Sequence, residues 1–310
     1  MTSRLGAIDI GTNSVRLLVA EVDGAGETAE LEPLDRRVRI TRLGQGVDES
    51  RRLNPEAISR TLDVLREYRA ALDELGVERA RATATSAARD AGNRDDFFGP
   101  ATDVLHFEPE LLPGTEEARL SFMGATAGLD EPAPYLTVDI GGGSTEFVGG
   151  THEPEGLISI DTGSVRITEQ YLRSDPPEPE ELSEAVSVVR AHLADVDREI
   201  PAAREAGTLV GLAGTITTVA AVELGLPEYD REKIHHFRLE RTSAEDVFRT
   251  LATEPADVRR HNPGLEPGRV DIIVGGALIL VAIMRTFDFN EMLVSEADIL
   301  DGLVRSISAR

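Results

Sequence analysis

Short apolar runs alternate along the chain with longer segments of helical periodicity. Apolar residues at spacings of three and four follow Asn54-Pro55, which predicts an amphipathic helix with Asn54 as its N-cap, ending at Gly76. The run 80–91 predicts a strand that continues into a turn or helix start. Further strands are predicted at 135–140, 145–149, 157–160 and 291–295, and further helices at about 180–197, 268–286 and 299–309. This alternation predicts an α/β fold.

The secondary structure of three further segments is predicted from their local sequence. The run VLHF at 104–107 predicts a short strand. Pro113-Gly114-Thr115 predicts a turn, with Thr115 as the N-cap of a helix whose first turn contains Glu116 and Glu117, where the helix dipole favours carboxylates. Residues 209–225 predict a buried strand, a glycine turn and a helix.

One stretch of the chain is repeated in a second place. Residues 7–19 read AIDIGTNSVRLLV and residues 137–149 read TVDIGGGSTEFVG, at a constant offset of 130 residues. Each is a strand, an Asp-Ile-Gly turn that ends in serine, and a second β-prone run. Glycine turns leave backbone amides accessible, and such amides bind phosphate oxygens. The repeat therefore predicts a duplicated domain with a phosphate-binding turn in each copy.

Length and composition exclude several classes of protein. The 310 residues (33.5 kDa) suffice for two domains, and the absence of cysteine excludes disulfides, thiolate zinc sites and cysteine nucleophiles. The apolar run 272–284 is shorter than the roughly 20 residues that span a membrane, and the first residues lack a signal-peptide pattern. We therefore expect a cytoplasmic protein.

The charge is strongly negative. Asp and Glu number 56 against 32 Lys and Arg, a formal net charge of −24, and Lys233 is the single lysine. Such a field argues against nucleic acid or anionic membranes as partners. Abundant carboxylates, scarce lysine and few aromatic residues are typical of halophilic proteins. We therefore expect a halophile as the source and screening of the self-repulsion by salt.

The motifs together resemble the Ppx/GppA phosphatase family, which comprises exopolyphosphatases and guanosine pentaphosphate phosphohydrolases. The matching segments are AIDIGTNSVRLLV, ATATSAARDAGN, LLPGTEEARLSFMG, VDIGGGSTEF, DTGSVRITEQY and LAGTITTVAAV. The resemblance implies an α/β fold of two actin-like (ribonuclease H-like) domains of the actin-like ATPase superfamily, with an interdomain cleft, in a short two-domain form. The expected domains are 1–121, to which the C-terminal helix is a candidate addition, and 122–310.

The implied activity is hydrolysis of the terminal phosphoanhydride of inorganic polyphosphate, with release of phosphate. A pppGpp 5′-phosphohydrolase that yields ppGpp is the alternative with the same chemistry. A non-hydrolytic nucleotide-binding sensor, or a small-molecule kinase of the superfamily, is an alternative of another class. Homodimer formation is also implied only by the resemblance.

The resemblance places site residues on this chain. Glu117 is the expected base or water-orienting residue, with Glu116 as the near alternative, and Arg89 is the expected active-site arginine. Carboxylates at strand ends suit Mg²⁺ or Mn²⁺. The expected metal ligands are Asp139, Glu146 and Asp9, and the expected phosphate-binding residues are Thr12, Asn13, Ser14, Gly141, Gly142, Gly143, Ser144 and Arg166.

Other positions are left open or depart from the family pattern. Gly214, Thr215 and Thr218 lie in a segment that resembles the superfamily's nucleoside-contacting loop, and a role in packing alone is equally compatible with their sequence. The adjacent His235 and His236 are expected to be loop residues. The family's usual Ser-Gly before the paired glutamates is Pro113-Gly114 here. Its C-terminal pattern SD-x-GLREG reads SEADILDG here, which puts Asp298 and Leu300 where glycine and arginine are usual.

Overall fold

The computed structural model describes residues 2–26 and 29–309. The chain forms two compact units, Met1–Leu129 with Asp298–Arg310, and Asp130–Ala297. The C-terminal helix α13 (Ile299–Ser308) belongs to the first unit. The expected domain boundary after residue 121 falls inside helix α5 (Gly114–Thr126). In the structure the first unit continues along the chain to Leu129, beyond the end of that helix.

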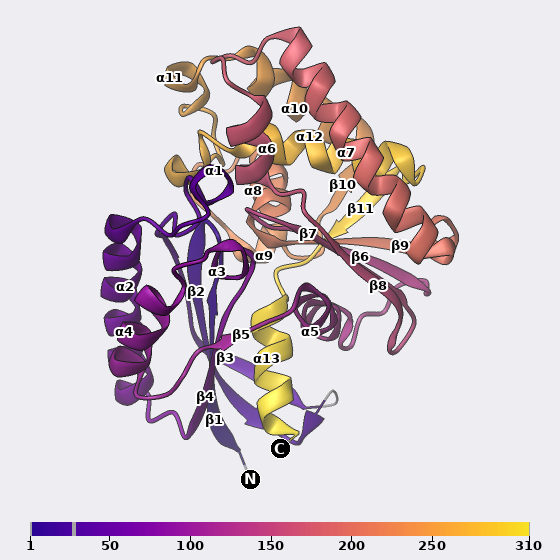
Figure 1. The fold of residues 1–310 in the computed structure, drawn as a ribbon. Helices are drawn as coiled ribbons and strands as arrows, with labels where there is room; N and C mark the ends of the chain where they lie inside the picture. The colour runs from indigo at the N-terminus through magenta and orange to yellow at the C-terminus, as the bar shows by residue number, and fades with distance from the viewer. Residues whose placement is uncertain (1, 27–28, 310) are drawn as a thin grey trace. The chain divides into compact units, whose positions relative to one another are not determined.

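The first unit is built on a mixed five-stranded sheet in the order β3-β2-β1-β4-β5. β1 pairs antiparallel with β2 and parallel with β4. The strands are β1 (Ser3–Ile10), β2 (Ser14–Asp23), β3 (Glu30–Ile40), β4 (Arg79–Ala84) and β5 (Glu110–Leu111). The helices are α1 (Val47–Ser50), α2 (Pro55–Glu74), α3 (Ser86–Asp90), α4 (Asp95–Leu105), α5 and α13 (Figure 1).

Two separate cores cover the two faces of this sheet. Because successive side chains of a strand point to opposite faces, Ile8 and Ile10 pack with α2 and α4, while Leu5 and Ala7 pack with α5 and α13. α5 and α13 approach so closely that a Cβ on Gly124 would lie 1.9 Å from the carbonyl oxygen of Asp298. The C-terminal helix thereby fixes the position of α5.

The second unit is built on a mixed six-stranded sheet in the order β10-β11-β9-β6-β7-β8. β6 pairs antiparallel with β7 and parallel with β9, so β8-β7-β6-β9 repeats the arrangement β3-β2-β1-β4. The strands are β6 (Tyr135–Ile140), β7 (Thr145–Gly150), β8 (Pro154–Ile160), β9 (Thr208–Leu212), β10 (Arg238–Glu240) and β11 (Glu291–Val294). The repeated order confirms the duplication that the two Asp-Ile-Gly segments predict.

The helices of this unit surround a core of its own. α12 is the long apolar segment of the chain, and nearly all of its residues are buried. Within residues 2–26 and 29–309, no helix combines the length and the apolar character that a membrane crossing requires. The helices are α6 (Ser164–Tyr171), α7 (Pro179–Glu199), α8 (Ala213–Glu223), α9 (Arg231–Ile234), α10 (Arg241–Thr253), α11 (Ala256–Arg259) and α12 (Ile273–Thr286), with 3₁₀ turns at Pro201–Glu205 and Pro267–Arg269.

Several local predictions are confirmed and two are wrong. Asn54 caps α2 by accepting from the N–H of Glu56, as predicted. The predicted strand 104–107 is instead the end of α4 and the residues after it, because α4 continues through Gly99 and Pro100. Thr115 is not an N-cap, since α5 begins one residue earlier, at Gly114, after Pro113.

Candidate functional site

The two Asp-Ile-Gly segments form the same hairpin turn, once in each unit. The N–H of Gly11 donates to the carbonyl of Ser14 at 2.9 Å, and the N–H of Gly141 donates to the carbonyl of Ser144 at 3.0 Å. The turn follows β1 in the first unit and β6 in the second. We call these turns the first hairpin (Gly11–Ser14) and the second hairpin (Gly141–Ser144).

The carbonyls of the second hairpin are bound by the start of α6. The N–H groups of Ser164 and Val165 donate to Gly141 and Gly142 at 2.9 and 2.8 Å, and Nε of Arg166 donates to Gly143 at 2.7 Å. Because a trans peptide points its C=O and N–H in opposite directions, the N–H groups of Gly143 and of the following Ser144 face away from α6. Neither N–H donates to an acceptor within the described part of the chain.

Gly163 permits this docking. A Cβ at residue 163 would lie 2.4 Å from the carbonyl oxygen of Gly142, a distance that side-chain carbons do not tolerate. Arg166, expected to contact phosphate, is buried and directs its Nε to the hairpin itself. The observed contact makes Arg166 a support of the second hairpin.

The first hairpin is held in the same manner by the segment after β3. The N–H groups of Thr41 and Arg42 donate to the carbonyl of Asn13 at 3.0 and 2.9 Å, and the N–H of Gly44 donates to Thr12 at 2.8 Å. The N–H of Asn13 therefore faces away from this segment. Nδ2 of Asn13 is buried without a hydrogen-bond partner, as is the hydroxyl of Thr41. Such orphaned donors are rare in proteins and are consistent with a ligand at this turn.

The two units differ in the residue opposite the Asp-Ile-Gly aspartate. In the first unit Asp9 pairs across the strands with Arg16, whose Nη2 and Nε lie 2.7 and 3.0 Å from Oδ2 of Asp9. Burial raises the pKa of Asp9, and Arg16 partly offsets this effect. In the second unit Asp139 lies opposite Glu146, so two carboxylates face each other across β6 and β7.

This difference bears on the expected metal ion. Among the residues the structure describes, no group of three or more Asp, Glu or His side chains is arranged to hold a metal. Mg²⁺ is commonly bound by one or two carboxylates, with waters and substrate phosphates completing its shell. Asp139 and Glu146, both buried, fit that pattern, and Glu146 is oriented by the hydroxyl of Ser159 at 2.7 Å. Asp9 fits it less well, because Arg16 already supplies the positive charge.

The expected base and the expected arginine lie in contact within the first unit. Glu117 is in the first turn of α5, and Arg89 is in α3, directly after β4. Nη1 of Arg89 donates to Oε2 of Glu117 at 2.7 Å and to the carbonyl of Leu112 at 2.9 Å. The side chain of Arg89 is 22% exposed and that of Glu117 is 13% exposed, and the hydrogen bond from the guanidinium orients the carboxylate.

Glu116 has a different environment. It pairs with Arg119 on its own helix at 2.8 Å, and this hydrogen bond lowers the pKa of Glu116. The partner Arg119 lies on the same helix, so this pair does not tie Glu116 to another element. The geometry therefore favours Glu117 over Glu116 as the water-orienting residue.

The departures at the C-terminal segment have a structural explanation. Asp298 caps α13, accepting from the N–H of Leu300 at 2.9 Å, and forms an ion pair with Arg16. Leu300 is buried in the core beneath α13. Arg36 of β3 completes the network through Asp301 at 2.7 Å. Sequence reasoning missed Arg16, although its place two residues after Ser14, where the repeat has Glu146, was a readable signal.

Gly214, Thr215 and Thr218, whose role the sequence leaves undecided between nucleoside contact and packing, lie in α8 near its start. Leu212, at the end of β9, is in register with Asp139, which puts this helix start beside the second hairpin. The hydroxyl of Thr218 donates to the carbonyl of Gly214 at 2.6 Å. A Cβ on Gly214 would meet the guanidinium of Arg269 at 2.1 Å, so this glycine is needed for packing. His235 follows α9 as a loop residue, as expected, and its Nδ1 accepts from the N–H of Glu296.

The chain contains a duplicated α/β unit with a glycine-containing hairpin in each copy. Arg89 binds Glu117, and further carboxylates are buried. These features are typical of enzymes that act on phosphates. The chain belongs to the Ppx/GppA phosphatase family, which matches it over residues 18–310. Exopolyphosphatase 2 of Mycobacterium tuberculosis is 43% identical over 316 aligned positions, covering 99% of both chains. The crystal structure of an exopolyphosphatase-like protein superposes with a TM-score of 0.93 at 37% identity, covering 98% of each chain. The Aquifex aeolicus PPX-GPPA enzyme gives a TM-score of 0.83 at 32% identity, covering 99% of this chain and 100% of its own.

Proposed function

We propose that this protein is an exopolyphosphatase that removes the terminal phosphate of inorganic polyphosphate. The observation that carries the proposal is the hydrogen bond from Arg89 to Glu117, because it holds the carboxyl group in one position, where it can orient a water molecule. The full-length similarity to a protein named exopolyphosphatase supports the choice of substrate. Water attacks the terminal phosphorus, the bond to the bridging oxygen breaks, and the products are phosphate and a chain shortened by one unit.

Each group has a role in this reaction. The outward N–H groups of the two hairpins bind phosphoryl oxygens, where preorganised donors stabilise charge as it develops. Glu117 orients the attacking water and accepts its proton, and Arg89 fixes the carboxylate. Asp139 and Glu146 are the residues that would hold Mg²⁺ or Mn²⁺. The bound ion would neutralise phosphoryl charge and lower the barrier to displacement.

The test follows released phosphate and the length of the remaining chains. The protein is purified in concentrated KCl and incubated with long-chain polyphosphate and Mg²⁺, with EDTA in a parallel sample. We expect phosphate release with shortening from the chain ends, and loss of release in EDTA. Absence of release by folded protein overturns the proposal, and pppGpp is then the next substrate to test. Release in EDTA overturns the metal dependence alone.

A further inference from the structure

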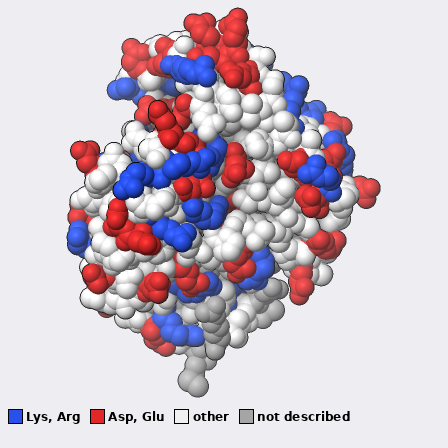
Figure 2. Space-filling model, viewed as in Figure 1, with Lys and Arg blue, Asp and Glu red and all other residues white. Residues whose placement is uncertain are grey.

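The first hairpin and Arg89 share a scaffold with a group of arginines that the reaction described above does not use. The segment that follows β3 carries Arg42 and Arg51, and Arg94 immediately precedes α4. We call these three residues the arginine track. Lys and Arg side chains gather over α1 and α3, the elements that border it, among scattered carboxylates (Figure 2).

Backbone contacts join this track to the site residues of the first unit. The N–H of Arg42 binds the first hairpin at the carbonyl of Asn13. A Cβ on Gly44 would lie 2.3 Å from Thr12 and 3.0 Å from Ala87, so this segment is pressed between the hairpin and α3. The carbonyl of Arg51 accepts from the N–H of Gly92 at 2.9 Å, just beyond α3.

The third member is tied to the same loop. The side chain of Asn93 accepts from the N–H of Leu53 at 2.7 Å and donates to its carbonyl at 3.2 Å. Arg94 follows Asn93 directly, so it stands beside the loop that carries Arg51. The track therefore extends from the first hairpin past the helix of Arg89.

The backbone of two track residues is strained. Arg42 has φ = 54° and Arg51 has φ = 53°, the left-handed region that costs an L-residue other than glycine or asparagine about 1 kcal/mol or more. Glycine or asparagine would adopt this conformation more readily. Arginine at both positions indicates a use for its side chain.

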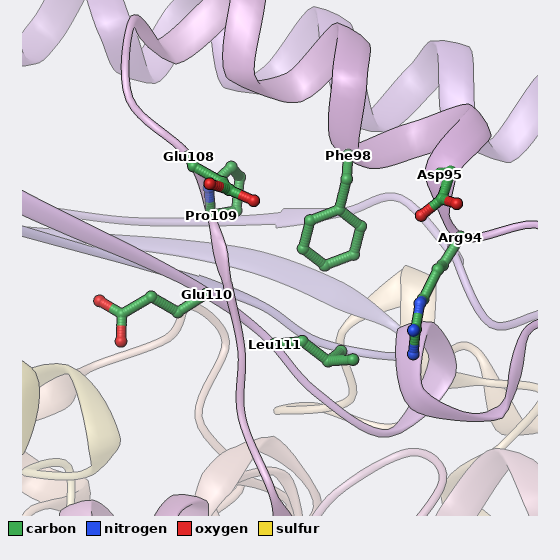
Figure 3. A pocket seen from close by; sticks show the side chains of 7 residues that line it. All are labelled: Arg94, Asp95, Phe98, Glu108, Pro109, Glu110 and Leu111. Carbon is green, nitrogen blue, oxygen red and sulfur yellow. The ribbon is translucent and has the colours of Figure 1, made fainter.

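Within the part of the chain that the structure describes, two of the three track residues also lack a carboxylate partner. The chain carries 56 carboxylates against 32 cationic side chains, so a partner for any arginine is abundant. Yet within the described residues the side chains of Arg51 and Arg94 form no ion pair. Arg94 itself lines a pocket together with Asp95, Glu108 and Glu110, and in Figure 3 its guanidinium points away from the carboxylate of Asp95. Exposed, unneutralised guanidinium groups beside a phosphate site are suited to a polyanion.

We propose that the arginine track binds the internal phosphates of the polyphosphate chain and so sets a preference for long chains. The inference rests on the proposed function and names the part of the substrate that these side chains contact. In this proposal tripolyphosphate occupies the phosphoryl site without engaging Arg51 and Arg94. A long chain engages both, and its affinity includes the charge-assisted hydrogen bonds of the track.

The test compares two double variants. Arg51→Gln with Arg94→Gln removes two track charges, whereas Arg66→Gln with Arg79→Gln removes two exposed charges elsewhere in the first unit. Arg66 lies on α2, and Arg79 begins β4, whose other end leads to α3. At roughly 0.2–1 kcal/mol per exposed ionic contact, each track arginine accounts for about a 1.4- to fivefold change. We expect kcat/KM for long-chain polyphosphate to fall by about tenfold in the track variant.

Tripolyphosphate and direct binding separate the outcomes. We expect turnover of tripolyphosphate to change less than about twofold in the track variant, and the control variant to match the wild type on both substrates. Equal losses on both substrates, equal losses in both variants, or no loss on long chains would overturn the proposal. Binding of long polyphosphate is also measured in a Glu117→Gln background, with and without the track substitutions. The binding measurement tests the role of the track even if the wild type releases no phosphate. Absence of phosphate release would overturn the proposed function but not the binding role of the track.

Discussion

Arg89 and Glu117 are 28 residues apart in the chain and are joined by a hydrogen bond of 2.7 Å. The bond links α3, which follows the parallel strand β4, to the first turn of α5. Nη1 of Arg89 also holds the carbonyl of Leu112, two residues before the start of α5, so the arginine fixes both the carboxylate and the approach to its helix. The proposed activity depends on this relationship.

Glu117→Gln is expected to lower phosphate release at least about 100-fold, because the amide cannot accept the proton of the attacking water. Binding of polyphosphate should remain, since the hairpins are unchanged. Glu116→Gln is the matched control, because Glu116 bonds Arg119 of its own helix. Initial rates and equilibrium binding distinguish the two variants. A Glu117→Gln protein with near-normal turnover, or an inactive Glu116→Gln protein, would contradict the assignment.

Arg89→Lys is expected to reduce kcat by about 10- to 100-fold, with a smaller effect on KM. Lysine keeps the charge, but its shorter side chain does not place a nitrogen where Nη1 of Arg89 donates to both Leu112 and Glu117, and a lost hydrogen bond to a charged group is worth about 1.5–3 kcal/mol. Steady-state kinetics on tripolyphosphate measures both parameters. A change in KM alone would show that Arg89 binds substrate without orienting the glutamate.

Gly163→Ala is expected to lower the free energy of unfolding by about 1–3 kcal/mol and to raise KM, because its Cβ would force α6 away from the second hairpin. Gly99→Ala is the control: residue 99 lies inside α4 with no atom near its Cβ position, so alanine should stabilise the helix by up to about 1 kcal/mol. Thermal unfolding and kinetics are measured together. Unchanged stability and KM in Gly163→Ala would refute the docking argument.

Asp139→Asn and Glu146→Gln are expected to raise the Mg²⁺ concentration for half-maximal activity at least about tenfold. Asp9→Asn should leave this concentration unchanged, since Arg16 occupies the equivalent place in the first unit. It should instead lower thermal stability through the loss of the buried ion pair. Activity titrations with MgCl₂ after EDTA treatment provide the measurement. A shift for Asp9→Asn as large as that for Asp139→Asn would assign Asp9 to the metal as well.

Thermal stability is expected to rise with KCl between about 0.1 and 1 M. The net charge of −24 destabilises the compact state, and the Debye length falls from about 10 Å to about 3 Å over this range. Thermal unfolding in sucrose solutions of the same osmolality serves as the control, because sucrose is excluded from the protein surface but does not screen charges. A melting temperature that is constant or falls with KCl would show that surface repulsion contributes little.

The sequence identified the parts of the site that are local and repeated. The Asp-Ile-Gly repeat predicted both hairpins because a glycine turn after a buried strand is determined by neighbouring residues. The pairing of Arg16 with Asp298 was not predictable, because it joins residues 282 positions apart whose contact depends on where α13 packs. The run VLHF was misassigned because four residues are too few to show a periodicity, and Pro100 argued against the helix that contains part of the run.

The proposed reaction requires Glu117 as the water-orienting residue and Asp139 as a metal ligand. The most direct measurement follows phosphate release from polyphosphate of defined length in Mg²⁺ by the wild type, Glu117→Gln and Asp139→Asn side by side. Glu117 lies in the first unit and Asp139 in the second. We predict that the wild type shortens the chains from their ends, that Glu117→Gln lowers release at least about 100-fold, and that Asp139→Asn lowers release at limiting Mg²⁺, while both variants stay folded. Phosphate release at the wild-type rate by either variant, or none by the wild type, would contradict the account.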